Sequence, residues 1–250
     1  MKSRILIASA MAVLALAGCK KSSSSGNAST AAAEKVTITQ ANPPPGGTWA
    51  DVVNRTADGY MMGNPDAKVK LIEIGSLSCP HCKAFEDEGV PTLVDKYVKS
   101  GRVSWEFRPY VIHGQIDVAA DILVRCGGLK TFFPLAQALY TDQATWMAKV
   151  EANADKFSQI QNLPTNQAFV ATANLLGLQD WFAARGVPQD KSNKCLGDQK
   201  MIDKEVQVTS NVNDEFPEFT GTPAFVINGK MLKDTASWDK LRPQLDAALK

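Results

Sequence analysis

The sequence predicts an α/β fold in two halves, a β-α-β unit and a later β-β-α unit, with a block of helices between them. Three observations support this prediction. Two strand-like apolar segments, 69–74 and 102–112, flank a stretch of helical spacing. Residues 116–213 repeat apolar side chains every three or four positions, which is typical of helices. A short apolar segment ending in Asn228-Gly229 then begins the second half with a hairpin signal.

The first half begins with the strand at 69–74, which runs into Gly75. A helix is expected from Pro80 to about Ser100, because proline in the first helical turn loses no hydrogen bond. Apolar and polar residues alternate within 102–112, as in a half-buried strand. Strand, helix and strand form a βαβ unit, which should cross over right-handedly. The apolar positions of the expected helix are Phe85, Val90, Leu93, Val94, Tyr97 and Val98.

The second half follows the helical block. The strand around Phe225 meets the Asn228-Gly229 turn, and a second strand is expected around Met231-Leu232. An amphipathic helix should end the chain, because its apolar residues share one helical face. These residues are Trp238, Leu241, Leu245, Ala248 and Leu249.

The N-terminal 18 residues are typical of an export signal. Lys2 and Arg4 precede a 13-residue apolar run, which is shorter than the ~20 residues that span a bilayer as a helix. Leu-Ala-Gly-Cys at 16–19 resembles the lipobox of bacterial lipoproteins, in which the cysteine is lipidated. We therefore predict lipidation at Cys19, with an ordinary residue after a conventional signal as the alternative. Lys20 is not the aspartate that retains lipoproteins at the inner membrane, so outer-membrane anchoring is favoured.

Composition excludes some classes of partner. Removal of residues 1–18 leaves 25 basic residues against 26 acidic ones, a formal charge of −1. Nucleic acid binding relies on clustered Lys and Arg, so we expect no nucleic-acid partner. The predicted organisation is a signal peptide at 1–18, a flexible Ser-, Ala- and Pro-rich tether at 19–48, the first half of the domain at 49–115, a helical insertion at 116–213 and the second half at 214–250.

Cys79-Pro80-His81-Cys82 places two thiols at the start of the predicted helix. Such a pair closes and reopens a small disulfide ring. A cysteine at a helix N-terminus is favoured as a thiolate by the unpaired N–H groups and the helix dipole. The dipole contributes up to ~2 kcal/mol, or little more than one pKa unit. A larger shift requires hydrogen bonds to the sulfur and a contribution from His81. Cys79 is then the attacked sulfur and Cys82 the resolving thiol.

Three features resemble the DsbA family of periplasmic thiol oxidoreductases. They are the Cys-Pro-His-Cys motif at 79–82, the Gly-Thr-Pro turn at 221–223, and Glu73 six residues before the first cysteine. The resemblance covers 64–250 and implies a thioredoxin fold interrupted by a helical domain. It also implies a cis bond before Pro223, whereas a trans strand-entry proline would be expected without it. The backbone of Thr222 would then pair with an extended substrate peptide.

The resemblance assigns further residues. Glu73 would help pass the proton of the buried cysteine; burial in the apolar strand should raise its pKa, and a solvated edge position is the alternative. Cys126 and Cys195 remain in the helical part, where some relatives carry a second bridge, so we predict a Cys126–Cys195 disulfide. Two free buried thiols are the alternative. His113, after the second strand, is expected to be a solvated turn residue.

These features predict a lipid-anchored, periplasm-facing thiol:disulfide oxidoreductase that donates a disulfide to unfolded or newly exported proteins. The resemblance implies a membrane quinone-linked reoxidase as its redox partner. Such an enzyme lies in the inner membrane, which conflicts with the outer-membrane sorting expected from Lys20. We expect a monomer that needs no cofactor besides its Cys79–Cys82 disulfide.

Two alternatives remain open. A reductase or isomerase of the same fold would use the same dithiol for a restricted partner. A non-catalytic metal-binding lipoprotein would instead use Cys79, His81 and Cys82 as half of a structural zinc site. Structural zinc takes four ligands, commonly from two paired motifs, and the second pair is absent from the sequence. We therefore predict no metal.

Overall fold

The computed structural model describes residues 38–160 and 162–250. The predicted signal peptide at 1–18, the lipidation site Cys19 and most of the predicted tether lie outside these residues. Within the two described ranges, no helix has both the length and the apolar character needed to cross a membrane.

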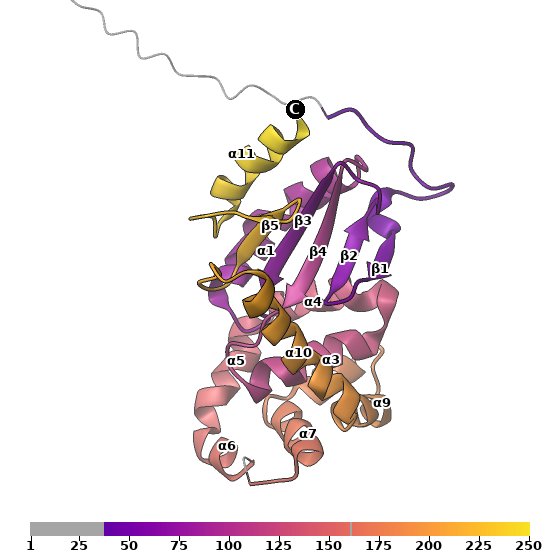
Figure 1. Ribbon diagram of the computed structural model, residues 1–250. Coiled ribbons are helices and arrows are strands. Elements are labelled where there is room, and N and C mark those ends of the chain that lie inside the picture. Colours follow the sequence, from indigo (N-terminus) through magenta and orange to yellow (C-terminus); the bar gives the residue numbers. More distant parts are fainter. Residues whose placement is uncertain (1–37, 161) are drawn as a thin grey trace, which may run out of the picture. The chain divides into compact units, whose positions relative to one another are not determined.

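The described residues form a six-stranded sheet in the order β1-β2-β4-β3-β5-β6 (Figure 1). The central strands β3 and β4 are parallel, and the other neighbouring strands are antiparallel. A helical segment connects β3 to β4, while β5 and β6 follow the helical block, so the two predicted halves share one sheet. The strands are β1 (Val53–Arg55), β2 (Tyr60–Gly63), β3 (Val69–Gly75), β4 (Val103–Pro109), β5 (Ala224–Ile227) and β6 (Lys230–Met231).

The β5–β6 hairpin turns at Asn228 and Gly229, as predicted. Both residues have positive φ, 49° and 81°, which a two-residue type I′ turn requires. The Asn228 side chain also accepts a hydrogen bond from the Lys70 backbone N–H at 2.8 Å. The turn residue therefore fastens the hairpin to the central strand β3.

The single helix predicted after Pro80 is interrupted. It comprises α1 (Pro80–Glu88), a short α2 (Val90–Thr92) and a π-helical segment (Leu93–Val98). Pro91 lacks the N–H that would continue the α1 ladder, which explains the break. Gly89 lies at the junction, where a Cβ atom would come within 2.8 Å of the Phe85 ring.

The helical insertion occupies the chain between β4 and β5. Its first helix is joined to its penultimate one by the Cys126–Cys195 disulfide, whose sulfur atoms are 2.04 Å apart. The last helix leads the chain back to the sheet (Figure 1). The insertion contains α3 (Gln115–Gly127), α4 (Phe132–Thr141), α5 (Gln143–Ala152), α6 (Ala154–Ile160), α7 (Thr165–Leu175), α8 (Leu178–Ala183), α9 (Gln189–Leu196) and α10 (Gln199–Glu215).

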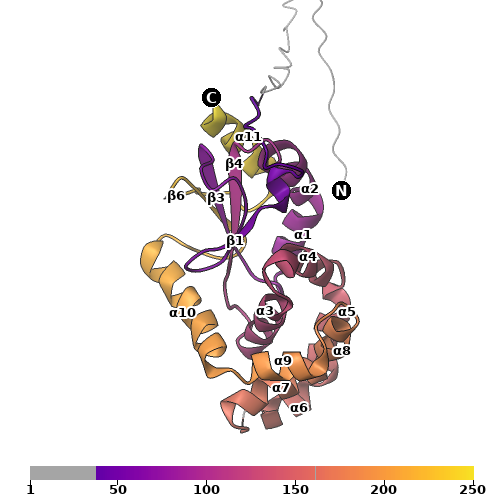
Figure 2. The ribbon, with the colours of Figure 1, turned by 90° about the vertical axis from the view of Figure 1, so that its right-hand side faces the viewer.

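Alternation along β3 sends its side chains to two faces of the sheet. Leu71 packs in the larger core with Phe85 of α1 and Trp238 of α11 (Trp238–Leu249). Ile74 packs in a second cluster with Val212 of α10. Figure 2, which views the sheet nearly edge-on, shows α10 on one side and α1 and α4 on the other. Glu73 shares the parity of Leu71 and therefore lies on the side of α1.

Two strands and a preceding segment were not predicted from the sequence. β1 and β2 form an antiparallel hairpin that extends the sheet beside β4. Contacts with the folded domain begin even before the 3-10 turn at Trp49–Asp51, because the Ala41 N–H donates at 2.8 Å to the carbonyl of Ser100, in the turn before β4. The three residues of β1 show no clear apolar alternation, and β1 is a strand because it pairs with β2.

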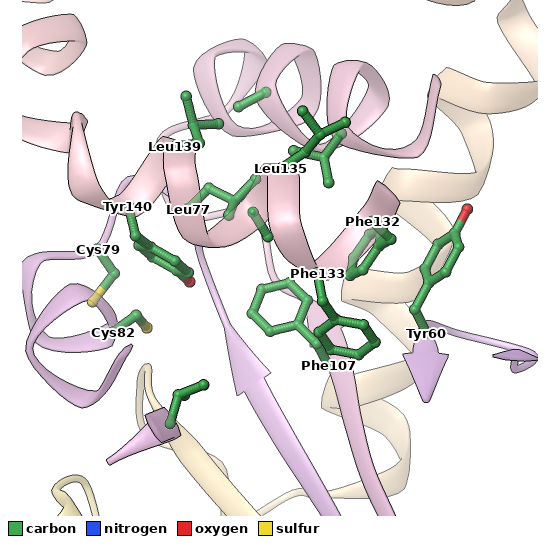
Figure 3. Close-up of a cluster of buried hydrophobic side chains, with 14 of the residues drawn as sticks. Tyr60, Leu77, Cys79, Cys82, Phe107, Phe132, Phe133, Leu135, Leu139 and Tyr140 are labelled. Atoms are coloured by element: carbon green, nitrogen blue, oxygen red, sulfur yellow. The ribbon is translucent and has the colours of Figure 1, made fainter. Parts of the chain in front are cut away.

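The larger core continues from the sheet into the insertion (Figure 3). Tyr60 of β2 stacks on Phe132 of α4, with ring centroids 3.8 Å apart. Trp105 of β4 contacts Phe133 at a centroid distance of 4.9 Å. This core reaches Cys79 and Cys82, which are themselves buried within it. The insertion and the sheet therefore share one core around the motif.

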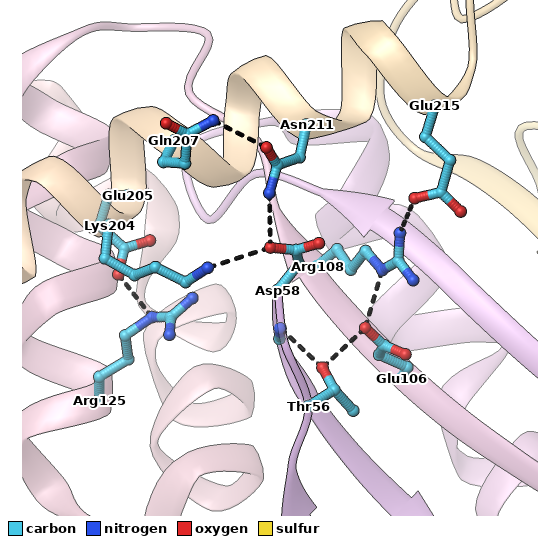
Figure 4. A network of polar contacts seen from close by, with 11 residues as sticks. Thr56, Asp58, Glu106, Arg108, Arg125, Lys204, Glu205, Gln207, Asn211 and Glu215 are labelled. Carbon is cyan, nitrogen blue, oxygen red and sulfur yellow. Dashed lines mark hydrogen bonds and ion pairs between the residues drawn. The ribbon is translucent and has the colours of Figure 1, made fainter.

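Polar contacts fasten α10 to the sheet (Figure 4). Asp58, in the β1–β2 turn, accepts hydrogen bonds from Lys204 at 3.1 Å and from Asn211 at 2.9 Å. Arg108 of β4 pairs with Glu215 at 2.6 Å. The returning helix is therefore held at several points along its length.

Candidate active site

Cys79 and Cys82 lie where β3 ends and α1 begins. Cys79 is the N-cap residue of α1, and Pro80 occupies its first turn. Both cysteines carry free thiols, with only 4% of Cys79 and 0% of Cys82 exposed. The Cys79 sulfur lies 3.4 Å from the carbonyl oxygen of Thr222, within reach of a hydrogen bond from the thiol form. Residues more than 140 positions apart in the sequence therefore meet at one sulfur.

The pKa of the Cys79 thiol is lowered to about 5. The largest cause is a hydrogen bond from the Cys82 thiol, and burial acts in the opposite direction. Backbone hydrogen bonds from Cys82 and His81, at the N-terminus of α1, lower the pKa further. The Thr222 carbonyl can only accept a hydrogen bond, so we ascribe the low pKa to Cys82 and the two amides. At neutral pH, Cys79 is a thiolate.

The pKa of Cys82 moves in the opposite direction and is raised well above its usual value. Burial is the largest cause, followed by the hydrogen bond that Cys82 gives to Cys79 and by the charge of Glu73. The Ser76 backbone N–H donates to the Cys82 sulfur at 3.5 Å and acts in the other direction. The pair therefore combines one ionised and one protonated sulfur.

His81 contributes differently from the expectation. Its side chain is exposed, and it makes no hydrogen bond to other residues in the described part of the chain. Its backbone N–H, rather than its imidazole, helps to lower the pKa of Cys79. Backbone N–H groups at the start of α1 therefore help to lower the pKa of Cys79, an effect that the sequence predicted for the His81 side chain.

The peptide bond between Thr222 and Pro223 is cis. The two residues border a surface hollow of about 540 Å³, which is also lined by Gly221, Met231 and Leu232. The hollow begins at the residue whose carbonyl contacts Cys79. It therefore offers backbone and apolar surface beside the reactive sulfur.

Glu73 is buried and only 1% exposed. Its pKa is raised well above the usual value, by burial first and then by the charge of Glu86. Trp105 donates a hydrogen bond to its carboxyl group at 3.1 Å, which lowers the pKa only in part. Glu86 is buried as well, and burial raises its pKa to about 7. Glu86 and Trp105 line a cavity of about 240 Å³ between the α1–α2 segment, β4 and α4.

Two residues of the insertion hold the loop before α1, and sequence reasoning did not find them. The Gln143 side chain donates to the carbonyls of Leu77 and Cys79 at 2.8 and 3.0 Å. The Tyr140 hydroxyl donates to the Ser76 carbonyl at 3.0 Å, and its ring lies beside the two cysteines (Figure 3). A polar residue within a helical repeat carries no sequence signal for a partner more than 60 positions away.

A second set of residues missed by the sequence adjoins the same loop. The Ser76 hydroxyl donates to Asp117 at 3.0 Å, and the Ser78 hydroxyl lies 2.6 Å from Nδ1 of His113. His113 is exposed, as expected for a turn residue. Its ring is nevertheless engaged with a buried serine.

The arrangement suits dithiol–disulfide exchange. A thiolate and a protonated partner one turn deeper lie beside Thr222, which borders a surface hollow. Across the described ranges, no three His, Cys, Asp or Glu side chains converge in a way that could hold a metal ion.

Comparisons with known proteins agree with this geometry. A family model described as Thioredoxin matches residues 55–247. A crystal structure of a protein-disulfide isomerase from Novosphingobium aromaticivorans is 31% identical, with a TM-score of 0.73 over 78% of this chain and 100% of that one. The crystal structure of Wolbachia pipientis alpha-DsbA1, 22% identical with a TM-score of 0.60, covers 76% of this chain and 89% of its own, and supports the fold.

Curated sequences give a consistent result. The thiol:disulfide interchange protein DsbA of Bordetella pertussis is 25% identical over 172 residues, which are 69% of either chain. A Rickettsia bellii protein, provisionally named a protein-disulfide oxidoreductase, is 26% identical over 170 residues, or 68% of this chain. The match spans only 56% of that relative's length. The family model, the fold and these relatives show that this chain belongs to the thioredoxin family, among its DsbA-like members.

Proposed function

We propose that the protein is a thiol:disulfide oxidoreductase that donates its Cys79–Cys82 disulfide to exported proteins. The observation that carries this proposal is the opposite ionisation of the two sulfurs. A pKa of about 5 at Cys79 favours the reduced, ionised form, so the disulfide is readily given up. The names of the DsbA-like relatives support the same chemistry.

The reaction proceeds by two thiol exchanges. A substrate thiolate attacks the Cys79 sulfur, the Cys79–Cys82 bond breaks, and Cys82 leaves as a thiolate that takes up a proton. A second substrate thiolate then attacks the substrate sulfur of this mixed disulfide, and Cys79 leaves. The substrate gains a disulfide, and the protein keeps two electrons as a dithiol. Cys79 is a good leaving group because its thiolate is stable at neutral pH.

Three other residues have proposed roles around these steps. Thr222 and Pro223 would bind an extended segment of the substrate, because they border the hollow beside Cys79. Glu73 would deliver the proton that Cys82 takes up. Burial raises its pKa well above the usual value, and its electrostatic effect on the pKa of Cys82 places the two groups within reach of each other.

An isomerase is the second candidate function. The solved relative at 31% identity is titled a protein-disulfide isomerase, and an isomerase uses the same dithiol in its reduced form. A reductase serving one partner would share the site as well. The reduction potential of the Cys79–Cys82 disulfide distinguishes a disulfide donor from an isomerase or a reductase.

The proposed setting follows from the N-terminal sequence. We place the protein in the periplasm, attached through a lipid at Cys19 and acting as a monomer on unfolded or newly exported proteins. A quinone-linked membrane enzyme would reoxidise Cys79 and Cys82.

The decisive experiment is the equilibrium of the Cys79–Cys82 disulfide with glutathione. A potential near about −120 mV is expected for a donor, whereas about −270 mV, the range of reducing thioredoxins, would contradict the proposal. Cys79→Ser should abolish oxidation of a reduced test protein. Cys82→Ser should accumulate mixed disulfides at Cys79. Efficient repair of a scrambled disulfide protein without net oxidation would favour the isomerase.

A further inference from the structure

A chain of hydrogen-bonding side chains runs from the surface to the loop that holds the cysteines. His113 Nδ1 lies 2.6 Å from the Ser78 hydroxyl, which lies 3.0 Å from the Ser76 hydroxyl. Ser76 in turn lies 3.0 Å from Oδ1 of Asp117. Ser76, Ser78 and Asp117 are buried, and only His113 reaches solvent. The Ser76 backbone N–H donates to the Cys82 sulfur at 3.5 Å, so the chain ends on a residue that contacts the reactive pair.

Which group donates in each of these side-chain hydrogen bonds follows from counting the available hydrogens, beginning at Asp117. Its Oδ2 accepts the backbone N–H groups of Ile112 and His113, both at 2.7 Å. Asp117 also lies in the first turn of α3, where a negative charge is favoured. Its other oxygen, Oδ1, accepts the Ser76 hydroxyl at 3.0 Å. The hydroxyl hydrogen of Ser76 is therefore the one that lies between Ser76 and Asp117.

The remaining two contacts need one hydrogen each. A serine hydroxyl carries a single hydrogen, so the 3.0 Å contact between the two serines requires the hydrogen of Ser78. If Ser78 donated to His113 instead, the two buried hydroxyl oxygens would have no hydrogen between them, and Ser76 Oγ would accept only the Ser78 backbone N–H at 3.2 Å. All three side-chain contacts carry a hydrogen only when the one between His113 and Ser78 comes from Nδ1 of the histidine, and this is the arrangement on which the proposal rests.

We propose that His113 is a positioning residue for the opening of the Cys79–Cys82 disulfide. Its Nδ1–H holds Ser78, Ser78 holds Ser76, and the Ser76 N–H is thereby kept against the Cys82 sulfur. When an attacking thiolate bonds to Cys79, the electron pair of the broken bond passes to Cys82, where this N–H stabilises the new thiolate. The inference rests on the proposed function, because disulfide opening is the step that it serves.

The protonation pattern can be measured in the unmodified protein. Long-range ¹⁵N NMR of the histidine rings should show a hydrogen on Nδ1 of His113. The tautomer of a histidine is set by the hydrogen bonds of its ring nitrogens. A hydrogen on Nε2, with Nδ1 as an acceptor, would reverse the chain and overturn the proposal.

Variants test the consequence for the reaction. The readout is the rate at which reduced glutathione opens the Cys79–Cys82 disulfide, with glutathione bonding to Cys79 and Cys82 leaving as the thiolate. His113→Ala should slow this step about tenfold, the factor of one partly lost hydrogen bond to a charged sulfur. His113→Asn keeps an N–H donor near the Nδ1 position and should stay within about twofold of the wild type. Gln115→Ala, two residues away on α3, is the matched control and should leave the rate unchanged.

A double variant tests whether the residues act through one chain. Ser78→Ala should slow opening as much as His113→Ala, and the combined variant should be no slower than either alone. Unchanged rates in both single variants, or additive losses in the double variant, would overturn the proposal. A reducing potential of the wild-type disulfide would instead contradict the donor function and leave the His113 result standing.

Discussion

At the residue scale, one four-residue motif contains two sulfurs whose pKa values move in opposite directions. Cys79 lies at the N-cap of α1. Its sulfur receives a hydrogen bond from the Cys82 thiol and further hydrogen bonds from the backbone N–H groups of Cys82 and His81. Cys82 lies one turn deeper, fully buried and close to Glu73. Position along a single helical turn therefore separates the ionised sulfur from the protonated one.

The hydrogen bond from Cys82 is the largest cause of the low pKa at Cys79, and this can be tested with a matched pair of variants. Cys82→Ala removes the donor and should raise the pKa of Cys79 by roughly one to two units, because hydrogen bonds to charged groups contribute about 1.5–3 kcal/mol. Cys82→Ser keeps an O–H donor and should raise it less. The pH dependence of Cys79 alkylation measures both, and equal pKa values in the two variants would contradict this cause.

The same pKa has a consequence for the stability of the reduced protein. The folded pKa of Cys79, about 5, lies below the unfolded value of about 8.5. Its contribution to stability is therefore fully present above the unfolded pKa and is lost as the pH falls toward 5. In Cys82→Ala, where the folded pKa is expected to be higher, the thermal midpoint should depend less on pH over this window.

At the element scale, the insertion helps to build the active site. Tyr140 of α4 and Gln143 of α5 bind carbonyls of the loop between β3 and α1. Asp117 of α3 binds the Ser76 hydroxyl of the same loop. The motif is therefore held from the sheet side by its own strand and from the other side by three inserted helices.

Gln143 provides the clearest test of this role. Gln143→Ala leaves the buried carbonyls of Leu77 and Cys79 without their donor, at a cost of about 1–3 kcal/mol. At roughly 2–4 °C per kcal/mol for a domain of this size, the thermal midpoint should fall by several degrees. Gln143→Glu keeps the length of the side chain but lacks the N–H groups, and it should be equally destabilised near neutral pH. Gln137→Ala, on the exposed side of α4, is the control. A loss no larger than that control would contradict the proposed role of Gln143.

At the scale of the whole molecule, several links bind the insertion to the sheet and to itself. The Cys126–Cys195 disulfide joins residues 69 positions apart, and a loop of this length contributes roughly 4 kcal/mol in the chain-entropy model. Asp58 and Arg108 fasten α10 to the sheet (Figure 4). In Asp58, burial raises the pKa, but the hydrogen bonds from Lys204 and Asn211 outweigh it and lower the pKa. This link is therefore retained at neutral pH and is lost only in strong acid.

The proposed membrane attachment also belongs to this scale. Cys19→Ala should move the protein from the membrane fraction to the soluble periplasmic fraction, because the proposed lipid would be attached through the Cys19 sulfur. Mass spectrometry of the mature wild-type N-terminus should detect the lipid. Membrane separation on a density gradient then distinguishes the outer membrane from the inner one. An unlipidated Cys19 in the mature protein would contradict the anchor.

Much of the fold followed from local patterns. The strands at β3 and β4, the Asn228-Gly229 hairpin and the terminal helix were predicted, because alternation and turn chemistry act over a few residues. The β1–β2 hairpin was not predicted, because it depends on pairing with β4 in the sheet. The helix break at Gly89 was not predicted either, and it results from the missing N–H of Pro91. The contribution of His81 also depends on the folded chain, since its backbone N–H at the helix start lowers the pKa of Cys79 while its side chain is exposed.

The sequence by itself indicated dithiol–disulfide chemistry, since two cysteines separated by two residues at a helix start are typical of a redox-active pair. Only the tertiary structure decided which groups surround that pair. Gln143, Tyr140, Asp117 and His113 reach the loop from elements far along the chain. The physical reason is that a thiol motif is local in sequence, whereas burial and hydrogen bonding around it depend on which surfaces the folded core brings together.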